Sequence, residues 1–172
     1  MPRYLAVSER VGIRRPRESD REEFCRLALA SRELHRPWIT APTTAEEYAA
    51  YLRRGRSRER EAFLICELDG GGLVGWVNIN GIQRRSFQSG ALGYGAFAPS
   101  AGKGLFGEGL GLVVRYAFDR LGLHRLEANL QPENHRSRAV VARLGFKQEG
   151  YSPEYLFIDG AWRDHERWAL IA

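Results

Sequence analysis

The stretch from Gly90 to Phe146 constrains the fold more than any other part of the sequence. It reads as a strand, a glycine-rich turn, a helix, a second strand and a capped helix, with Gly102 and Gly104 in the turn. Glycines let a backbone approach a ligand closely. The free N–H groups and positive dipole at the start of a helix favour an anion, typically a phosphate. The stretch therefore predicts that a phosphate-bearing cofactor binds at the start of the central helix.

Length and composition favour one globular domain. The chain has 172 residues and a hydrophobic fraction of 44%, which predicts a single α/β domain over residues 1–172. No apolar run approaches the ~20 residues that a membrane-spanning helix needs, and the N-terminal segment lacks the apolar core of a signal peptide. Cys25 and Cys66 stand in apolar surroundings without metal-like spacing, so we interpret them as buried free thiols. These features predict a cytoplasmic protein without a membrane partner.

Charge and histidine spacing narrow the choice of partners. The net charge of +5 suits anionic partners such as nucleotides, CoA-like cofactors or nucleic acid. Because no basic block is interleaved with aromatic residues, direct readout of nucleic acid is disfavoured. The histidines, His35, His124, His135 and His165, lack the spacing of a metal site, and we expect no metal cofactor.

Periodicity and turn signals assign the flanking segments to helices and hairpins. A helix capped by Ser19 carries Phe24 and Leu27 on its apolar face, and Thr43 or Thr44 begins a second helix over residues 45–54. Glycine-containing turns at 69–72 and 159–160 predict hairpins, which favours antiparallel pairing. Strands are expected over 11–16, 62–68, 73–80, 91–97 and 126–130, with a further pair in the closing hairpin.

The glycine turn has competing interpretations. Residues 102–107 match the pattern G-x-G-x-x-G, and Glu127 follows at about the 20-residue spacing of a dinucleotide-binding fingerprint. However, too little chain follows the turn for a doubly wound sheet. The preceding strand also contains Gly93 and Gly95 instead of the apolar run of a buried parallel strand. An acyl-CoA site fits these features better, and a turn without any ligand is the third interpretation.

Motifs along nearly the whole chain identify the acyl-CoA alternative with a known family. The segments HRPW, LGYGAF, AGKGLFGEGL, HRLEANLQPENHRSRAVVARLGFKQEGY and YLFIDGAWRDH resemble the RimJ/RimL branch of the GNAT superfamily of N-acetyltransferases. Within that branch they most resemble the ribosomal-protein-alanine N-acetyltransferases. The family's turn reads roughly Gln/Arg-x-x-Gly-x-Gly/Ala, and this chain departs from it at Ala101 and Phe106. The resemblance implies a mixed α/β fold, with a mostly antiparallel sheet of about six to seven strands and flanking helices.

The resemblance also implies which residues hold the acetyl-CoA cosubstrate. The strand end at Ala96, Phe97 and Ala98 is expected to splay from the strand at 126–130 and to offer its backbone to the pantetheine amides. The turn residues Gly102, Lys103, Gly104, Leu105, Phe106 and Gly107 are expected to hold the pyrophosphate. The Lys103 ammonium is either a phosphate partner or a solvated charge, and the Phe106 ring packs on either the cofactor or the core.

Two residues at the start of the next helix complete the expected cofactor site. Asn134 is typical of an N-cap, and in the family this residue also contacts the pantetheine arm. Ser137 lies one turn into the helix and is either an ordinary first-turn serine or a hydroxyl near the CoA sulfur. Many GNAT enzymes place a proton-donating tyrosine later on this helix, where this chain has Val141. We therefore take Ser137 as the candidate catalytic residue.

The acceptor side carries weaker signals. Trp38 and Tyr155 are candidates for walls of an acceptor pocket, and Glu154 for attracting a cationic amine, although aromatic residues in a small domain are more often core. The sequence identifies no strong general base. Acylation nevertheless requires the acceptor amine in its neutral form. A protein α-amine costs roughly 3 to 4 kcal/mol less to deprotonate than a lysine side chain. The sequence thus favours transfer of an acetyl group to a primary amine at a protein N-terminus, such as that of a ribosomal protein.

Two other functions fit the same sequence. In the first, the acceptor is a small-molecule amine, such as an aminoacyl nucleotide or an antibiotic. Alternatively, the departures at Ala101, Phe106 and Val141 mark a non-catalytic CoA-binding protein. The sequence does not identify the acceptor, because similarity to a fold family predicts the type of reaction better than it predicts the substrate.

Overall fold

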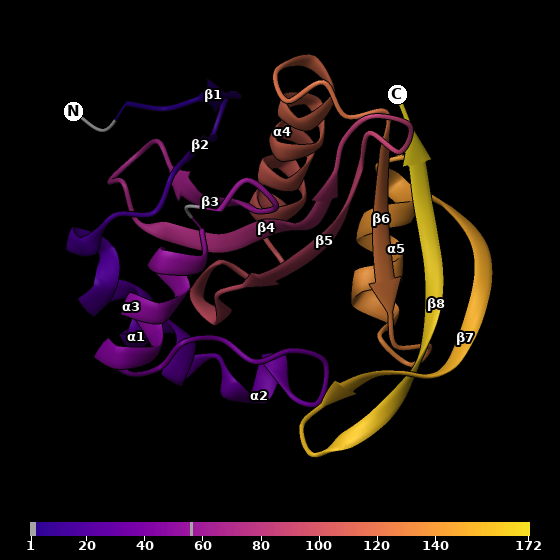
Figure 1. Ribbon diagram of the computed structural model, residues 1–172. Coiled ribbons are helices and arrows are strands. Elements are labelled where there is room, and N and C mark those ends of the chain that lie inside the picture. The colour runs from indigo at the N-terminus through magenta and orange to yellow at the C-terminus, as the bar shows by residue number, and fades with distance from the viewer. Residues whose placement is uncertain (1–2, 56) are drawn as a thin grey trace.

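A single mixed sheet organises the computed structural model, which describes residues 3–55 and 57–172 (Figure 1). Within these residues eight strands lie in the order β1-β2-β3-β4-β5-β6-β8-β7. Every neighbouring pair is antiparallel except β5 and β6, which are parallel. The expected mixed, mostly antiparallel α/β architecture is confirmed. The strand that the sequence did not indicate is β1, which is two residues long.

The elements alternate along the chain much as the turn signals indicated. The strands are β1 Ala6–Val7, β2 Val11–Arg14, β3 Glu61–Glu67, β4 Leu73–Gln83, β5 Ser89–Ala96, β6 Arg125–Leu130, β7 Lys147–Ile158 and β8 Ala161–Ile171. The α-helices are α1 Arg21–Ala30, α2 Arg32–His35, α3 Ala45–Arg54, α4 Leu105–Asp119 and α5 His135–Arg143. Short 3-10 turns cover Glu18–Asp20 and Ala98–Ser100. No helix in the described ranges is long and apolar enough to cross a membrane.

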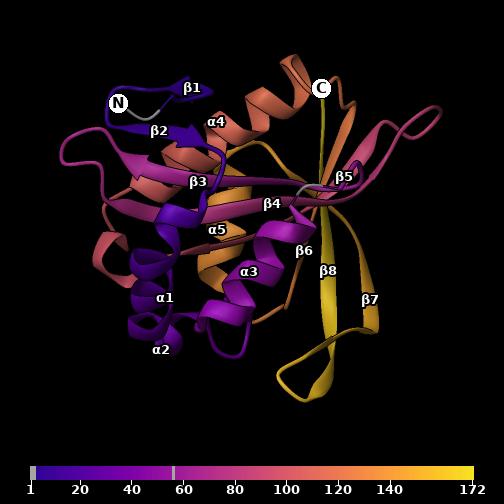
Figure 2. The ribbon, with the colours of Figure 1, turned by 60° about the vertical axis from the view of Figure 1, so that its left-hand side comes forward.

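Helices cover both faces of the sheet, and each face has its own core. Figure 2 shows α4 above strands β3 and β4 in that view, with α1 and α3 below them. On β3, Phe63 and Ile65 join the core under α4 and α5, whereas Leu64 and Cys66 join the core under α1 and α3. This alternation is the two-residue period of a strand that is buried on both faces. Cys66 is fully buried as expected, and Cys25 is only half-buried.

Of the two predicted N-caps, the one at the start of α3 is confirmed and the one at the start of α1 is wrong. Thr44 caps α3, its hydroxyl accepting the Glu47 N–H at 3.2 Å. Ser19 does not cap α1, because it lies inside the 3-10 turn that precedes Arg21. The neighbouring Asp20 has the anchoring role instead, since its buried carboxylate accepts hydrogen bonds from Nη1 and Nη2 of Arg14 at 2.8 and 2.7 Å. A carboxylate offers one oxygen to each of the two terminal nitrogens of a buried arginine, which a single serine hydroxyl cannot do.

Strands β5 and β6 separate part-way along the sheet. They pair from Ser89↔Arg125 to Leu92↔Ala128, and beyond this point β5 keeps only β4 and β6 keeps only β8 as partners. Figure 1 shows the two strands diverging there, with α5 behind β6 in that view. Phe97 N–H donates to Val74 O at 2.8 Å, so by antiparallel alternation the backbone groups of Tyr94 and Ala96 point away from β4 and into the gap.

Helix α4 lies close against the sheet and fixes the position of the glycine turn. A Cβ at Gly109 would meet Cγ2 of Ile65 at 2.3 Å, so only glycine allows this approach of α4 to β3. The buried face of α4 contains Leu105, Leu110, Val113 and Ala117. The N-terminus of α4 is therefore held rigidly beside the end of β5.

Candidate active site

The glycine turn presents a row of free amides. Gly102 and Gly104 have φ angles of +76° and +77°, a left-handed conformation that favours glycine. Within the described residues, no backbone carbonyl or side chain accepts the N–H groups of residues 102–107, because they begin α4. A Cβ at Gly102 would meet nothing within 4 Å, so this side of the turn is open. The turn thus has the free donors and the space that a phosphate requires.

Only the backbone of Leu105 and Phe106 faces this opening. The Leu105 side chain is buried in the core under α4. The Phe106 ring packs on Tyr94 with 5.7 Å between ring centroids, and it lies where a Cβ at Gly75 would be, 2.8 Å away. Of the two alternatives for Phe106, its side chain takes the core position. Gly107 leaves open space at its Cβ.

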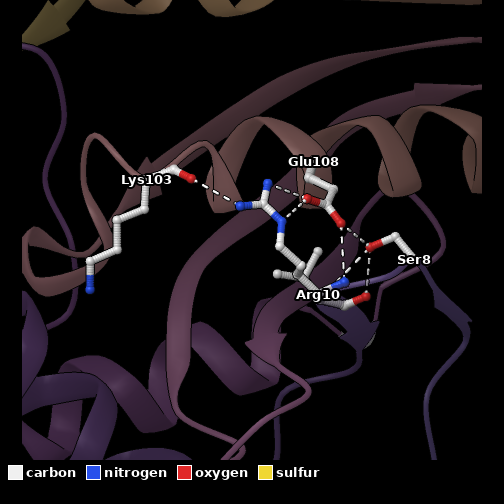
Figure 3. A network of polar contacts seen from close by, with 5 residues as sticks. Ser8, Arg10, Lys103 and Glu108 are labelled. Atoms are coloured by element: carbon white, nitrogen blue, oxygen red, sulfur yellow. Dashed lines mark hydrogen bonds and ion pairs between the residues drawn. The ribbon is translucent and has the colours of Figure 1, made fainter.

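An ion-pair network that the sequence did not reveal anchors the turn from behind (Figure 3). Glu108, in the first turn of α4, accepts hydrogen bonds from Ser8 Oγ at 2.7 Å and Arg10 Nε at 2.8 Å. Arg10 Nη1 also donates to the Lys103 carbonyl at 3.2 Å. These hydrogen bonds, first that of Ser8 and then that of Arg10, lower the pKa of the Glu108 carboxyl. The Lys103 side chain points away from the network, so its ammonium is free to meet an anion.

The strand end before the turn differs from its expected role. Ala98 N–H donates to Ser31 Oγ at 2.9 Å, and Phe97 N–H is taken by Val74. The carbonyls of both residues accept hydrogen bonds within the following 3-10 turn. Their backbone groups are therefore not free for a ligand, in contrast to the expectation, because this segment turns back into the protein after β5 ends.

Ala96 is the residue of this strand end whose N–H stays open to the gap. Its carbonyl is bound by His35 Nε2 at 2.8 Å, and His35 is buried against Trp76. Burial lowers the pKa of His35, so the ring is neutral at neutral pH and donates one N–H to this carbonyl. His35 thereby fixes the orientation of the peptide group at the end of β5.

Asn134 and Ser137 lie at the N-cap and in the first turn of α5, as the sequence indicated, and Ser137 contacts Tyr94 of β5. Asn134 caps α5, its Oδ1 accepting the Ser137 N–H at 3.2 Å. The Ser137 hydroxyl lies 2.6 Å from the Tyr94 hydroxyl, which reaches across from β5. Burial raises the pKa of Tyr94 to about 12, so this phenol stays protonated, and either hydroxyl of the pair can donate the hydrogen bond.

Tyr94 is the site residue that the sequence analysis missed. Its signal was its position between Gly93 and Gly95 on the strand before the turn. Val141, at the place where the family has a tyrosine, is fully buried in the core. The hydroxyl groups that this region offers come instead from Tyr94 of β5 and Ser137 of α5.

A pocket of about 250 Å³ includes Tyr94, the hydrogen-bond partner of Ser137, in its lining. Its walls come from the loop after α2, from β4 and β5, and from the tip of the β7–β8 hairpin: Trp38, Ile39, Thr40, Trp76, Asn78, Gly93, Tyr94, Phe157, Ile158 and Asp159. Figure 1 shows the hairpin tip and the loop after α2 approaching each other across the lower end of the sheet. Arg36 Nη2 binds Asp159 Oδ1 at 3.2 Å and links these two walls.

The predicted acceptor residues divide between this pocket and the outer surface. Trp38 lines the pocket. Glu154 and Tyr155 lie on β7 outside the lining, where Tyr155 packs edge-on against His165 with 6.0 Å between the ring centroids. No group of three His, Cys, Asp or Glu residues in the described ranges is arranged to hold a metal ion.

Comparison with known proteins gives consistent matches. The model of the acetyltransferase (GNAT) domain family matches residues 10–147. The chain is 32% identical over 178 residues to [ribosomal protein uS5]-alanine N-acetyltransferase of Escherichia coli (strain K12), covering 99% of this chain and 92% of that protein.

Solved structures agree with the sequence match. RimJ of Mycobacterium smegmatis, in complex with CoA-disulfide, superposes with a TM-score of 0.85 at 33% identity, covering 94% of this chain and 82% of that one. The ribosomal-protein-S5-alanine acetyltransferase of Vibrio fischeri has a TM-score of 0.85 at 26% identity, covering 96% and 95%.

Proposed function

The chain belongs to the GNAT family of acetyl-CoA-dependent N-acetyltransferases, and from this premise we propose that its acceptor is the N-terminal α-amine of a cytoplasmic protein. A ribosomal protein with an alanine N-terminus is the specific candidate, because the 32% identical relative carries that activity in its name. The proposal needs no metal in the reaction. The observation that supports it best is the chemistry of the pocket beside the gap.

The pocket suits the end of a polypeptide better than a polyamine. Aromatic side chains form much of its wall, and its one carboxylate among the described lining residues, Asp159, is already paired with Arg36. A ligand with several ammonium groups calls for several unpaired carboxylates, because each desolvated charge needs a partner. A single amine on a small residue needs only one polar contact among apolar walls.

The gap between β5 and β6 fits the pantetheine arm of acetyl-CoA. An extended chain with amide groups hydrogen-bonds to free strand backbone as an added strand does. Tyr94 and Ala96 supply such groups, and the amides of residues 102–107 take the pyrophosphate, with the Lys103 ammonium as a further partner. Asn134 and Ser137 lie at the end of this path, where the thioester is expected.

The residues around the thioester support direct attack by the amine. The amine nitrogen bonds to the thioester carbonyl carbon, the carbon–sulfur bond breaks, and the amine loses one proton to water. The Ala96 N–H is placed to stabilise the oxyanion, an effect of up to ~3–4 kcal/mol when the donor is well aligned. Tyr94, the stronger acid of the hydroxyl pair, donates to Ser137 Oγ and leaves the Ser137 proton free for the departing sulfur. The thiolate then takes its proton from water.

A panel of acceptors tests the proposal. We expect thiol release from acetyl-CoA with peptides that begin with Ala, and mass spectrometry should place the acetyl group on the α-amine. The matched control peptide carries a blocked N-terminus and an internal lysine, and it should be inert. Turnover of spermidine or an aminoglycoside without turnover of any peptide would replace the protein acceptor by a small amine. CoA binding without turnover of any acceptor would identify a non-catalytic protein.

A further inference from the structure

Asn78 is a buried polar residue at the floor of the acceptor pocket. It lies on β4, its side chain is part of the pocket lining, and only 6% of the residue is exposed. Its neighbour across the sheet is Gly93 of β5, which has no side chain to cover the amide. A buried amide beside an open space is unusual, because most buried polar groups are covered by their own hydrogen-bond partners.

The Asn78 amide has an unmet hydrogen bond. Its Oδ1 is shielded from solvent, and no donor lies within hydrogen-bond distance of it among the described residues. A buried acceptor without a donor is costly, and it persists where a missing ligand supplies the donor or where the group has a catalytic role. The terminal torsion of asparagine is broad, so a rotation about χ2 is enough to bring the oxygen to the pocket when a donor enters it.

Two glycines let neighbouring side chains pack directly on strand β5 beside this amide. A Cβ at Gly95 would lie 2.2 Å from the Trp76 ring and 2.7 Å from Ile39, and a Cβ at Gly93 would lie 3.1 Å from Asn80 Nδ2. The strand that carries Tyr94 therefore has no side chain on the pocket face at either neighbouring position. Asn78 is the one residue with an amide side chain among the described lining residues.

We propose that Asn78 Oδ1 accepts a hydrogen bond from the acceptor amine and so selects primary amines. The inference rests on the proposed function and assigns the amine to this pocket. A neutral primary amine has two N–H groups and one lone pair. One N–H is held by Asn78, the lone pair attacks the thioester carbon, and the other proton leaves to water. The N–H that Asn78 holds remains as the N–H of the product amide.

This arrangement distinguishes primary from secondary amines. A peptide that begins with N-methylalanine has one N–H as a neutral amine, and its acetylated product has none. Binding that single N–H to Asn78 leaves the nitrogen without a proton to lose to water. The wild-type enzyme is therefore expected to turn over a peptide beginning with Ala at least tenfold faster than its N-methyl counterpart, in terms of kcat/KM.

Substitutions at Asn78 test the assignment on the full-length enzyme. Asn78→Ala should lower kcat/KM for the Ala peptide about tenfold to a hundredfold, because a site built to bind an N–H loses its acceptor. Asn78→Asp keeps an acceptor oxygen in the same place and should stay within about fivefold of wild type. The affinity for CoA, measured by calorimetry, should be unchanged in both variants. The matched control is Asn80→Ala, which removes an amide from the same strand outside the pocket lining.

The outcomes separate this inference from the proposed function. If the wild-type enzyme acetylates none of the peptides, the proposal that the acceptor is a protein N-terminus is wrong. An active wild-type enzyme with Asn78→Ala equally active, or impaired only as much as Asn80→Ala, overturns the role of Asn78 alone. If thermal melting shows that Asn78→Ala does not fold, the result for Asn78→Asp is decisive. A loss of more than tenfold in kcat/KM for Asn78→Asp, with CoA affinity intact, overturns the inference. Equal turnover of the Ala peptide and its N-methyl counterpart by the wild-type enzyme also overturns it.

Discussion

The cofactor turn and the acceptor pocket are built in opposite ways. The turn is one continuous segment whose binding groups are backbone amides of residues 102–107. The pocket takes its walls from separate segments that meet only in the folded protein, and its chemistry comes from side chains such as Trp38 and Asn78. A backbone site demands particular residue types in a row, chiefly glycine. A side-chain pocket demands only that distant residues converge, which places no pattern in the sequence.

The largest expected effect is on the turn, from Gly104→Val. The φ of +77° at Gly104 strains any β-branched residue by ~1–3 kcal/mol, and the new side chain extends into the space proposed for the phosphate, beside Arg10. We expect the Kd for CoA, measured by calorimetry, to rise about a hundredfold, or ~2.7 kcal/mol. Gly122→Val is the control, since φ there is +64° and the position lies after α4. Equal CoA affinities for wild type and Gly104→Val would exclude the turn as the phosphate site.

The second-largest effect is expected from Ser137→Ala, at the residue between the cofactor turn and the acceptor pocket. Because Ser137 is assigned to the departing sulfur, its removal should lower kcat about tenfold and leave the Kd for CoA and the KM for peptide unchanged. Tyr94→Phe should lower kcat less, and adding it to Ser137→Ala should have little further effect, since both act through one hydrogen bond. Pre-steady-state kinetics establish that chemistry limits turnover. Unchanged kcat under that condition would leave Ser137 as a first-turn helix residue only.

A change in the pocket wall should affect the acceptor alone. Trp38→Ala removes an aromatic wall, and we expect the KM for an Ala peptide to rise about tenfold with the Kd for CoA unchanged. Phe87→Ala removes an aromatic residue that is 66% exposed in the loop before β5 and should change neither constant. If Trp38→Ala weakens CoA binding as much as peptide binding, the two regions are not separable in the way the structure indicates.

The smallest effect concerns the support behind the turn. Glu108→Gln breaks the ion pair with Arg10 and should weaken CoA binding only a few-fold, because the pair is partly exposed. The folded pKa of Glu108 lies below its ordinary value, so its contribution to the free energy of unfolding is fully present above about pH 4.3. That contribution, less than about 1 kcal/mol, is lost as the pH falls through the lowered pKa.

Urea unfolding at neutral and acid pH measures the pH dependence. The difference in unfolding free energy between wild type and Glu108→Gln should be present at neutral pH and vanish below the folded pKa. Glu18→Gln is the control, because its pair with Arg21 is exposed and belongs to the 3-10 turn and α1. A difference that persists unchanged into acid would show that the charge of Glu108 is not what holds the turn.

Local sequence determined the elements and the cofactor turn of this protein. The alternation of strands, the Thr44 cap, the glycine hairpins and the turn at Gly102 and Gly104 all follow from preferences within a few residues. The motif at Asn134 and Ser137 was legible for the same reason, since an N-cap and its first turn are neighbours in the chain. These preferences act before distant segments meet, so they leave a readable pattern.

Tertiary structure alone decided which side chains meet. The pairing of Tyr94 with Ser137, the Arg10 link to Glu108 and the unpartnered amide of Asn78 join residues that are far apart in the sequence or depend on the strand neighbours. The sequence analysis also assigned Phe97 and Ala98 free backbone groups, which Val74 and Ser31 take in the fold. Whether a donor or acceptor is free depends on every group that packs around it, and this is a property of the whole sheet and not of any local pattern.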